Sequence, residues 1–374
     1  MRILSIFGAR PQFVKAALVS RRLRQDGEID EVLVNTGQHY DEMMSDIFLR
    51  ELEMPAPDYN LEAGSGSHAA QTARILERTE KVLITEKPDC AIVYGDTNST
   101  LGGALAAAKL HIPVVHVEAG LRSFNRRMPE ELNRVVTDHL ADLLLAPSER
   151  AKGRLLDEGI PESRIEVVGD VMYDAALHFL EISEASSTIL QRLALTPKEY
   201  ALCTIHRAEN TEDLTRLDRI LSAFDTVSLE MPVVLPVHPR LRDTIDSARF
   251  ERNFSPNFKM IGPVGYLDMI ALERNAAVVA TDSGGVQKEA FFYQVPCVTL
   301  RGETEWMELI ELGWNRLVPP DGTSDVAAAL RSSIGAAGQT DARPYGDGDA
   351  AGKIVNAVRK LCSKNPFTRE EVVQ

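Results

Sequence analysis

Twelve short, continuously apolar runs alternate with helix-like segments along the chain, and this alternation constrains the fold more than any other feature. Strands that are apolar throughout are typical of parallel sheets covered by helices on both faces. Six runs fall in each half of the chain: residues 2–7, 31–35, 90–94, 113–117, 142–146 and 165–169, then 200–205, 232–237, 258–261, 277–281, 296–300 and 315–319. The pattern predicts two doubly wound α/β domains that face a cleft.

The length of the chain agrees with two domains, because 374 residues exceed what one hydrophobic core usually fills. We expect a first domain at residues 1–169 and a second at residues 170–352, divided near "GDVMYDAA". Residues 353–374 begin with an amphipathic helix, "KIVNAVRKL", that is expected to pack back on the first domain.

Composition excludes several classes of function. A net charge of −14 argues against nucleic-acid partners and against anionic membranes. The sequence shows no bilayer-spanning apolar run, signal-peptide pattern or metal-ligand spacing, so we expect a cytoplasmic protein without a metal. The cysteines form no CxxC pair and are expected to be reduced structural thiols: Cys90, Cys203, Cys297 and Cys362.

The second half carries a candidate nucleotide-binding turn in "VVATDSGGVQKEAFF". Ser283, Gly284 and Gly285 follow a strand and open a helix, whose free N–H groups and dipole form an anion site. Glu289 lies one turn inside the helix, where its carboxylate is placed to bind a vicinal diol such as a ribose. The alternative is an ordinary glycine turn with a solvated glutamate; we prefer the nucleotide interpretation.

Carboxylates follow two strands of the first half. Asp96 ends the strand of "VYGDTNST", where it is alternatively a plain helix cap. Glu118 in "HVEAGLRS" is expected to share a strand and a side with His116, and a glutamate there is costly unless paired or functional. In "PEELNR", Glu130 and Arg134 are spaced for a helical ion pair, although "PEE" alone is typical of a solvated helix start.

Basic residues mark further strand ends. Arg10 and Lys15 lie at the first strand-to-helix turn, in "GARPQFVK". In the second half, His206 of "CTIHRAEN" and His238 of "PVHPRL" each follow a strand, which favours phosphate or proton chemistry over a purely structural role. The combined set indicates acid/base chemistry beside a diphosphate leaving group.

In order and spacing, eight stretches resemble the non-hydrolysing UDP-N-acetylglucosamine 2-epimerases over nearly the whole chain: "GARPQFVK", "TGQH", "YGDTNST", "HVEAGLRS", "PEELNR", "TIHRAEN", "VHP" and "TDSGGVQKEA". The resemblance implies an isomerase with two Rossmann-like domains in the arrangement of GT-B glycosyltransferases. It also implies no NAD or other cofactor, no metal and a homodimer built through the first domain. The implied reaction inverts C2 of a UDP-2-acetamido sugar by eliminating UDP and adding it back, as in the conversion of UDP-GlcNAc to UDP-ManNAc for surface polysaccharide.

The same resemblance assigns roles to individual residues. The catalytic carboxylates fall on Asp96, Glu118 and Glu130. The positions near the diphosphate are Arg10, His206, Ser283 and Gly284, with His206 also counted among the catalytic residues, and the ribose-binding glutamate is Glu289. We assign Lys15, Arg134, His238 and Gly285 to substrate binding as well.

Several stretches depart from the usual family pattern. "SFNRRMP", "RGETEWMEL" and "GDVMYDA" resemble the subgroup that acts on UDP-2,3-diacetamido-2,3-dideoxyglucuronate, where Arg126 and Arg127 would pair with the C6 carboxylate unless both are simply solvated. Asp41 and "GSGSHAAQ" replace residues that the family uses for allosteric activation. A GT-B glycosyltransferase and a non-catalytic nucleotide-sugar binding protein remain the alternative functions.

Overall fold

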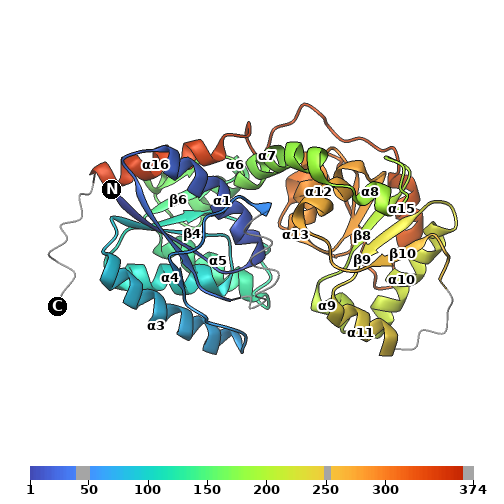
Figure 1. The fold of residues 1–374 in the computed structure, drawn as a ribbon, viewed down its shortest axis with the longest axis horizontal. Helices are drawn as coiled ribbons and strands as arrows, with labels where there is room; N and C mark the ends of the chain where they lie inside the picture. The colour runs from blue at the N-terminus through green and yellow to red at the C-terminus, as the bar shows by residue number, and fades with distance from the viewer. Residues whose placement is uncertain (39–50, 248–253, 365–374) are drawn as a thin grey trace. The chain divides into compact units, whose positions relative to one another are not determined.

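The computed structural model describes residues 1–38, 51–247 and 254–364, and Asp41 lies outside them (Figure 1). The chain forms two compact units. Unit 1 comprises Met1–Leu177 and Arg343–Gln374, and unit 2 comprises His178–Ala342. The passage from unit 1 to unit 2 therefore falls within helix α7 (Val171–Ser186), whereas the boundary that we expected lies at residues 169/170.

Unit 1 contains a parallel sheet with the strand order β3-β2-β1-β4-β5-β6-β7. The strands are β1 (Arg2–Phe7), β2 (Asp30–Asn35), β3 (Tyr59–Asn60), β4 (Cys90–Tyr94), β5 (Val114–Val117), β6 (Leu143–Ala146) and β7 (Ile165–Val167). The central strands are buried because helices cover both faces of the sheet (Figure 1). Besides α7, those helices are α1 (Arg10–Gln25), α3 (His68–Glu86), α4 (Asn98–Lys109), α5 (Pro129–Leu140), α6 (Glu149–Asp157) and α16 (Ala350–Lys364), with a 3₁₀ turn at Glu162–Arg164.

Helices α1 and α16 pack together on one face of this sheet, and α3, α4 and α5 pack side by side on the other (Figure 1). The C-terminal helix α16 thus completes unit 1 although its residues are distant in sequence. Its N-terminus is capped by Asp174 of α7, whose carboxylate accepts hydrogen bonds from the N–H groups of Ala350 and Ala351. Burial raises the pKa of Asp174.

Unit 2 contains a second parallel sheet with the order β10-β9-β8-β11-β12-β13. Its strands are β8 (Ala201–Thr204), β9 (Val233–Pro236), β10 (Phe258–Ile261), β11 (Val278–Thr281), β12 (Cys297–Thr299) and β13 (Asn315–Leu317). Its helices are α8 (Ile189–Arg192), α9 (Ala208–Thr211), α10 (Leu214–Ser228), α11 (Pro239–Ser247), α12 (Tyr266–Asn275), α13 (Gly284–Phe292), α14 (Met307–Glu311) and α15 (Val326–Ser333). Helices α10 and α15 pack together over a core of buried aliphatic side chains.

The predicted pair of Rossmann-like α/β domains is confirmed, and each of the twelve apolar runs overlaps a strand. In each sheet the strand order reverses beside its first strand, between β1 and β4 in unit 1 and between β8 and β11 in unit 2. Ligands of doubly wound sheets bind beyond the carboxyl ends of the strands at this reversal. The candidate residues should therefore be sought at those two places. None of the described helices is long and apolar enough to cross a membrane.

Candidate active site

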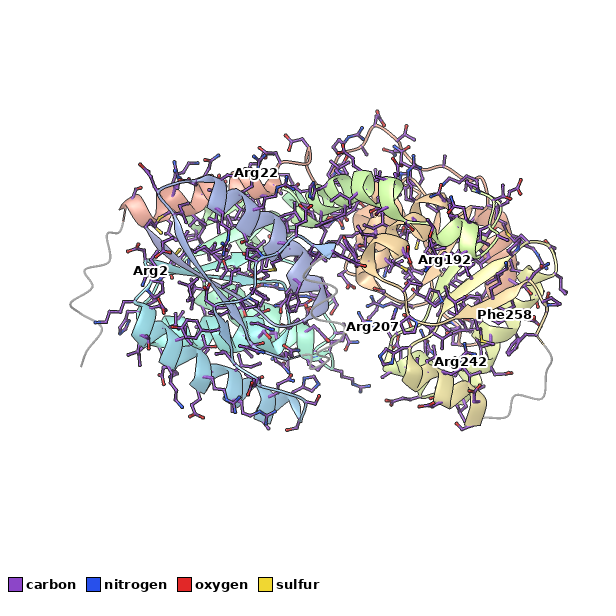
Figure 2. All side chains as sticks on the ribbon, in the orientation of Figure 1. Arg2, Arg22, Arg192, Arg207, Arg242 and Phe258 are labelled. Carbon is purple, nitrogen blue, oxygen red and sulfur yellow. The ribbon has the colours of Figure 1, made fainter. Side chains whose placement is uncertain are left out.

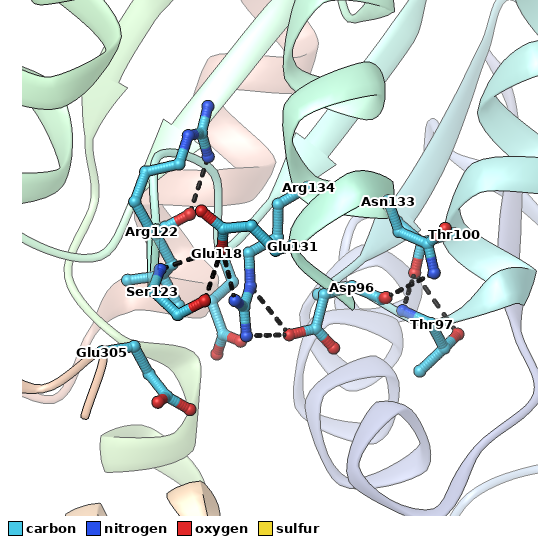
Figure 3. Close-up of polar contacts among 12 residues, drawn as sticks. Asp96, Thr97, Thr100, Glu118, Arg122, Ser123, Glu131, Asn133, Arg134 and Glu305 are labelled. Atoms are coloured by element: carbon cyan, nitrogen blue, oxygen red, sulfur yellow. Dashed lines mark hydrogen bonds and ion pairs between the residues drawn. The ribbon is translucent and has the colours of Figure 1, made fainter. Parts of the chain in front are cut away.

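The first predicted carboxylate, Asp96, lies beyond the carboxyl end of β4 in unit 1. Its Oδ2 atom accepts hydrogen bonds from Nη2 of Arg134 at 2.6 Å and from Nε at 3.0 Å (Figure 3). Asn133 holds the backbone carbonyl of the same residue at 2.9 Å. The side chain of Thr97 caps α4, so Asp96 does not serve as the cap of that helix. Its carboxylate is a quarter exposed and remains accessible beside the guanidinium.

The second carboxylate, Glu118, follows the neighbouring strand β5. Its Oε1 atom lies 2.7 Å from Nζ of Lys15, and both side chains are buried. The φ angle of Glu118 is 72°, which is unusual for a residue with a side chain and marks a functional or strained position. Gly95 also has a positive φ, and a Cβ there would lie 3.2 Å from Nζ of Lys15, so glycine leaves room for the ion pair.

The expectation that His116 and Glu118 share one strand is wrong, because β5 ends at Val117 and the backbone of Glu118 is left-handed. His116 is fully buried behind the site. Its Nδ1 atom lies 2.7 Å from Oδ1 of Asp138, and its Nε2 atom donates to the carbonyl of Gly95 at 2.7 Å. His116 therefore supports the turn that carries Asp96.

Asp138 of α5 is the centre of this buried network. Its carboxylate also pairs with Nη1 of Arg122 at 2.7 Å and accepts a hydrogen bond from the N–H group of Gly120 at 3.1 Å. Burial alone raises the pKa of Asp138, but the contacts with His116 and Arg122 outweigh that effect and lower it. The network fixes the backbone beside Asp96 through the carbonyl of Gly95 and the backbone beside Glu118 through the N–H group of Gly120.

Helix α5 supplies the third carboxylate, Glu130, in its first turn. Glu130 is partly exposed, and its side chain makes no hydrogen bond or ion pair with any residue that the structure describes. The next residue, Glu131, is buried, which contradicts the solvated helix start expected from "PEE" alone. Arg134 pairs with this Glu131 at 3.0 Å as well as with Asp96.

Two exposed arginines precede α5 in the loop at residues 123–128. Arg126 and Arg127 are both at the surface. The N–H group of Arg127 donates to Oδ1 of Asn125 at 3.1 Å, so its backbone is held by a local turn. These two residues supply positive charge to the stretch of chain between Glu118 and Glu130.

In unit 2, β11 leads into α13 through the predicted glycine turn. Ser283 is the N-cap of α13, but its side chain makes no capping hydrogen bond, so the first N–H groups are not satisfied by that side chain. A Cβ on Gly284 would lie 2.7 Å from Oε1 of Glu305, so a larger residue would have to displace that carboxylate. Gly285 is exposed, and Glu289 is buried one turn further along.

His206 follows β8, the strand beside β11, and its side chain is exposed. Arg207 comes next in the same turn (Figure 2). The carboxylate of Asp282 accepts hydrogen bonds from the backbone N–H groups of His206 at 2.9 Å and of Arg207 at 3.1 Å. His238 is exposed two residues after β9 and is one strand further from the reversal of the sheet.

The side chain of Arg10 lies outside the part of the chain that is described; its backbone begins α1. Sequence analysis missed two anchors of the site, Glu131 and Asp282. Asp282 stands directly after a strand in "TDSGG", which is a usable signal, whereas Glu131 carries none. Among the described residues, no group of three or more histidine, cysteine, aspartate and glutamate side chains is arranged to hold a metal ion.

Comparison with known proteins supplies the family. The family model described as UDP-N-acetylglucosamine 2-epimerase matches residues 21–359. A UDP-N-acetylglucosamine 2-epimerase homolog of Methanococcus maripaludis is 49% identical, over 96% of this chain and 100% of its own. The UDP-2,3-diacetamido-2,3-dideoxy-D-glucuronate 2-epimerase of Pseudomonas aeruginosa is 47% identical over the same shares.

The structural similarity agrees with this match. The UDP-GlcNAc 2-epimerase of Methanocaldococcus jannaschii, solved in complex with UDP-GlcNAc and UDP, superposes with a TM-score of 0.88 at 41% identity. The superposition covers 96% of this chain and 100% of that one. The chain therefore belongs to the UDP-N-acetylglucosamine 2-epimerase family of isomerases.

Proposed function

We propose that this protein inverts C2 of a UDP-2-acetamido sugar by eliminating UDP and adding it back to the opposite face. The observation that supports the proposal most is the placement of Asp96 and Glu118 at the ends of neighbouring strands, each beside a buried cation, Arg134 or Lys15. Glu130 adds a third carboxylate from the helix that carries Arg134. Such a set supplies a proton acceptor and a proton donor for the two faces of one carbon.

In the proposed reaction, one carboxylate takes the proton from C2, and the electrons of the C2–H bond form a C1=C2 double bond. The C1–O bond breaks at the same time, and its electron pair leaves with UDP. The product is a 2-acetamidoglucal. A second carboxyl group then delivers a proton to the opposite face of C2, while the β-phosphate oxygen of UDP forms a new bond to C1. We assign these duties to Asp96, Glu118 and Glu130 as a group.

We propose that unit 2 binds the UDP part of the substrate. The first turn of α13 directs backbone N–H groups and the positive end of a helix dipole at a diphosphate. Within unit 2, Glu289 is assigned to the ribose and His206 to the phosphates, and Gly285 and His238 are assigned to the same substrate. Arg10, which begins α1 of unit 1, is also assigned to the phosphates. A fixed cation stabilises the negative charge that grows on UDP as the C1–O bond breaks.

We further propose that the preferred sugar is UDP-2,3-diacetamido-2,3-dideoxyglucuronate, with the manno epimer destined for surface polysaccharide. The relative from Pseudomonas aeruginosa is named for that substrate. Arg126 and Arg127 are exposed cations between Glu118 and Glu130 and are suited to a C6 carboxylate, whereas UDP-N-acetylglucosamine has a neutral hydroxyl there. The preference is expected in kcat/KM.

The test is to incubate the protein with each sugar nucleotide alone in D₂O and to follow C2 by NMR. We expect C2 inversion with deuterium incorporation and a higher kcat/KM for the uronate. No exchange with either sugar contradicts epimerisation; a transferase needs an acceptor, and a binding protein shows affinity without exchange. If UDP-N-acetylglucosamine is preferred, or if Arg127→Ala slows both sugars equally, the substrate assignment is wrong and the epimerase proposal stands.

We also propose a homodimer formed through unit 1. Leu132 and Val136 are exposed one helical turn apart on α5, with 42% and 43% of their surfaces accessible, and such a stripe suits a subunit interface. Light scattering should give twice the mass of the chain. A monomer at low micromolar concentration contradicts this assignment.

A further inference from the structure

Glu131 is a buried residue, and both oxygens of its carboxylate accept hydrogen bonds. Its Oε2 atom accepts hydrogen bonds from the N–H group and the hydroxyl of Ser123, at 2.9 and 3.1 Å. Its Oε1 atom accepts from the N–H group of Phe124 at 2.8 Å, and Arg134 completes the set (Figure 3). Only 3% of the residue is exposed, so these contacts are made away from water.

The residues that Glu131 holds begin the loop at residues 123–128. Phe124 has a φ of 60°, a conformation that costs energy for an aromatic residue and persists only where its surroundings impose it. The residue is 73% exposed, and the guanidinium of Arg154 lies 5.7 Å from its ring centroid. Because Glu131 binds the N–H group of this strained residue, it fixes the direction in which the loop leaves β5.

The far end of the same loop is held by hydrogen bonds within the loop, which centre on Asn125. Asn125 accepts the N–H group of Arg127 on its side chain and that of Met128 on its backbone carbonyl, at 3.1 and 3.0 Å. Asn125 in turn donates its N–H group to Oγ of Ser123, which is bonded to Glu131. The contacts run without interruption from Glu131 to the backbone of Arg127.

Glu131 is also tied to the proposed acid/base group. Arg134 donates Nη1 to Glu131 and Nη2 to Asp96, so one guanidinium fixes the two carboxylates relative to each other. A change at Glu131 is therefore transmitted in two directions, to Asp96 through Arg134 and to Arg127 through the loop.

We infer that Glu131 is a positioning residue that fixes the loop at residues 123–128, which carries Arg126 and Arg127, relative to Asp96. In this way it confers selectivity for a sugar nucleotide with a carboxylate on the sugar. This inference rests on the proposed function, because it concerns the substrate of the same site. Glu131 acts through its neighbours and does not itself exchange the C2 proton. Loss of its charge should release the loop, and the cost should fall mainly on the sugar that the arginines recognise.

The experiment compares Glu131→Gln with a matched control, Glu149→Gln, which alters an exposed glutamate in the first turn of α6. The readout is the ratio of kcat/KM for the uronate to kcat/KM for UDP-N-acetylglucosamine, with thermal unfolding measured on each variant. We expect the ratio to fall about tenfold in Glu131→Gln and to stay unchanged in the control. A tenfold change is the scale of one weakened charge-assisted contact. A purely structural role lowers the amount of folded enzyme and leaves the ratio unchanged, which would overturn the inference.

Two further variants keep the test decisive if Glu131→Gln folds poorly. Ser123→Ala removes one hydrogen bond to Glu131 and should lower the same ratio about threefold; an unchanged ratio contradicts the inference. The double variant Glu131→Gln/Arg127→Ala should show little more loss of selectivity than Arg127→Ala alone, whereas fully multiplicative losses mean that the two residues act independently. A wild-type protein inactive on both sugars contradicts the proposed function and this inference together, and an active wild type with unchanged ratios contradicts this inference alone.

Discussion

Lys15 and Glu118 form a buried ion pair, with Nζ of Lys15 lying 2.7 Å from Oε1 of Glu118. Lys15 belongs to the helix that follows β1, and Glu118 follows β5, so the pair joins segments on either side of β4. A buried pair of this kind contributes little net stability, but removal of one partner leaves an uncompensated charge. Lys15 therefore supports the charge of Glu118 in addition to any contact with substrate.

We predict that Lys15→Met lowers the free energy of unfolding by about 3 kcal/mol, because Glu118 loses its buried ion pair with Lys15. The double variant Lys15→Met/Glu118→Gln should recover part of that loss, since the remaining amide is neutral. Urea denaturation of the two single variants and the double variant measures the coupling. Additive losses would show that the two side chains are energetically independent.

For Glu118→Gln alone, we predict that turnover falls at least about a hundredfold, which is the contribution of one acid/base group. UDP affinity should stay close to that of the wild type, because Glu118 is assigned to proton transfer and not to UDP. Steady-state kinetics and calorimetric titration with UDP separate the two effects. Turnover at the wild-type level would remove Glu118 from the mechanism.

The pH dependence of stability should reveal the buried network around Asp138. The folded-state pKa of Asp138 lies below its usual value of 3.8, so the unfolded chain binds more protons as the pH falls. The stability that this carboxylate contributes is complete above the unfolded pKa and is lost as the pH falls through the folded pKa. The pKa of Glu131 is also lowered, from its usual value of 4.5, so this residue loses stability with falling pH in the same way. Burial opposes ionisation, but the N–H groups of Ser123 and Phe124 and the charge of Arg134 lower its pKa.

We therefore predict that Asp138→Asn is about 3 kcal/mol less stable than the wild type at pH 7, because His116 and Arg122 lose a charged partner. The difference in stability between the two proteins should hold above the usual pKa of 3.8 and should narrow as the pH falls below that value. Chemical denaturation across this range is the measurement. A constant difference at every pH would mean that Asp138 does not titrate with unfolding.

In unit 2, we predict that Asp282→Asn weakens UDP binding about tenfold, because the amide cannot accept all of the hydrogen bonds that now fix His206 and Arg207. Asp321→Asn is the matched control, since Asp321 is an exposed aspartate whose carboxylate accepts hydrogen bonds from Thr323 in its own turn. Calorimetry with UDP compares both variants. Equal affinities in the two variants would contradict a role for Asp282 in ordering the nucleotide site.

Much of the fold was predictable, because a strand buried on both faces must be apolar throughout, as "CAIVY" in β4 is. The edge strand β3 was not, since Tyr59–Asn60 has only two residues and no apolar pattern. Asp96 and Glu118 were predictable as carboxylates at strand ends. The positive φ of Glu118 was not predictable, because glycine is the residue whose presence in a sequence usually indicates that conformation.

The burial of Glu131 depended on tertiary contacts that no local pattern contains. In sequence it is the second glutamate of an ordinary helix start, next to a partly exposed Glu130. Its surroundings arise because Ser123 and Phe124, in the loop before the helix, present two N–H groups to one carboxylate. A side chain that binds the backbone of the loop before its own helix is therefore the part of this site that sequence analysis misses.

The cleavage of the bond between the sugar and UDP is tested most directly with oxygen isotopes. A sugar nucleotide carrying ¹⁸O in the bridge between C1 and the β-phosphorus is incubated with the protein and examined by ³¹P NMR. If UDP leaves and returns, the label moves from the bridge into the non-bridging positions of the β-phosphate as C2 inverts. Inversion of C2 with all of the label retained in the bridge would contradict elimination and re-addition as the reaction of this protein.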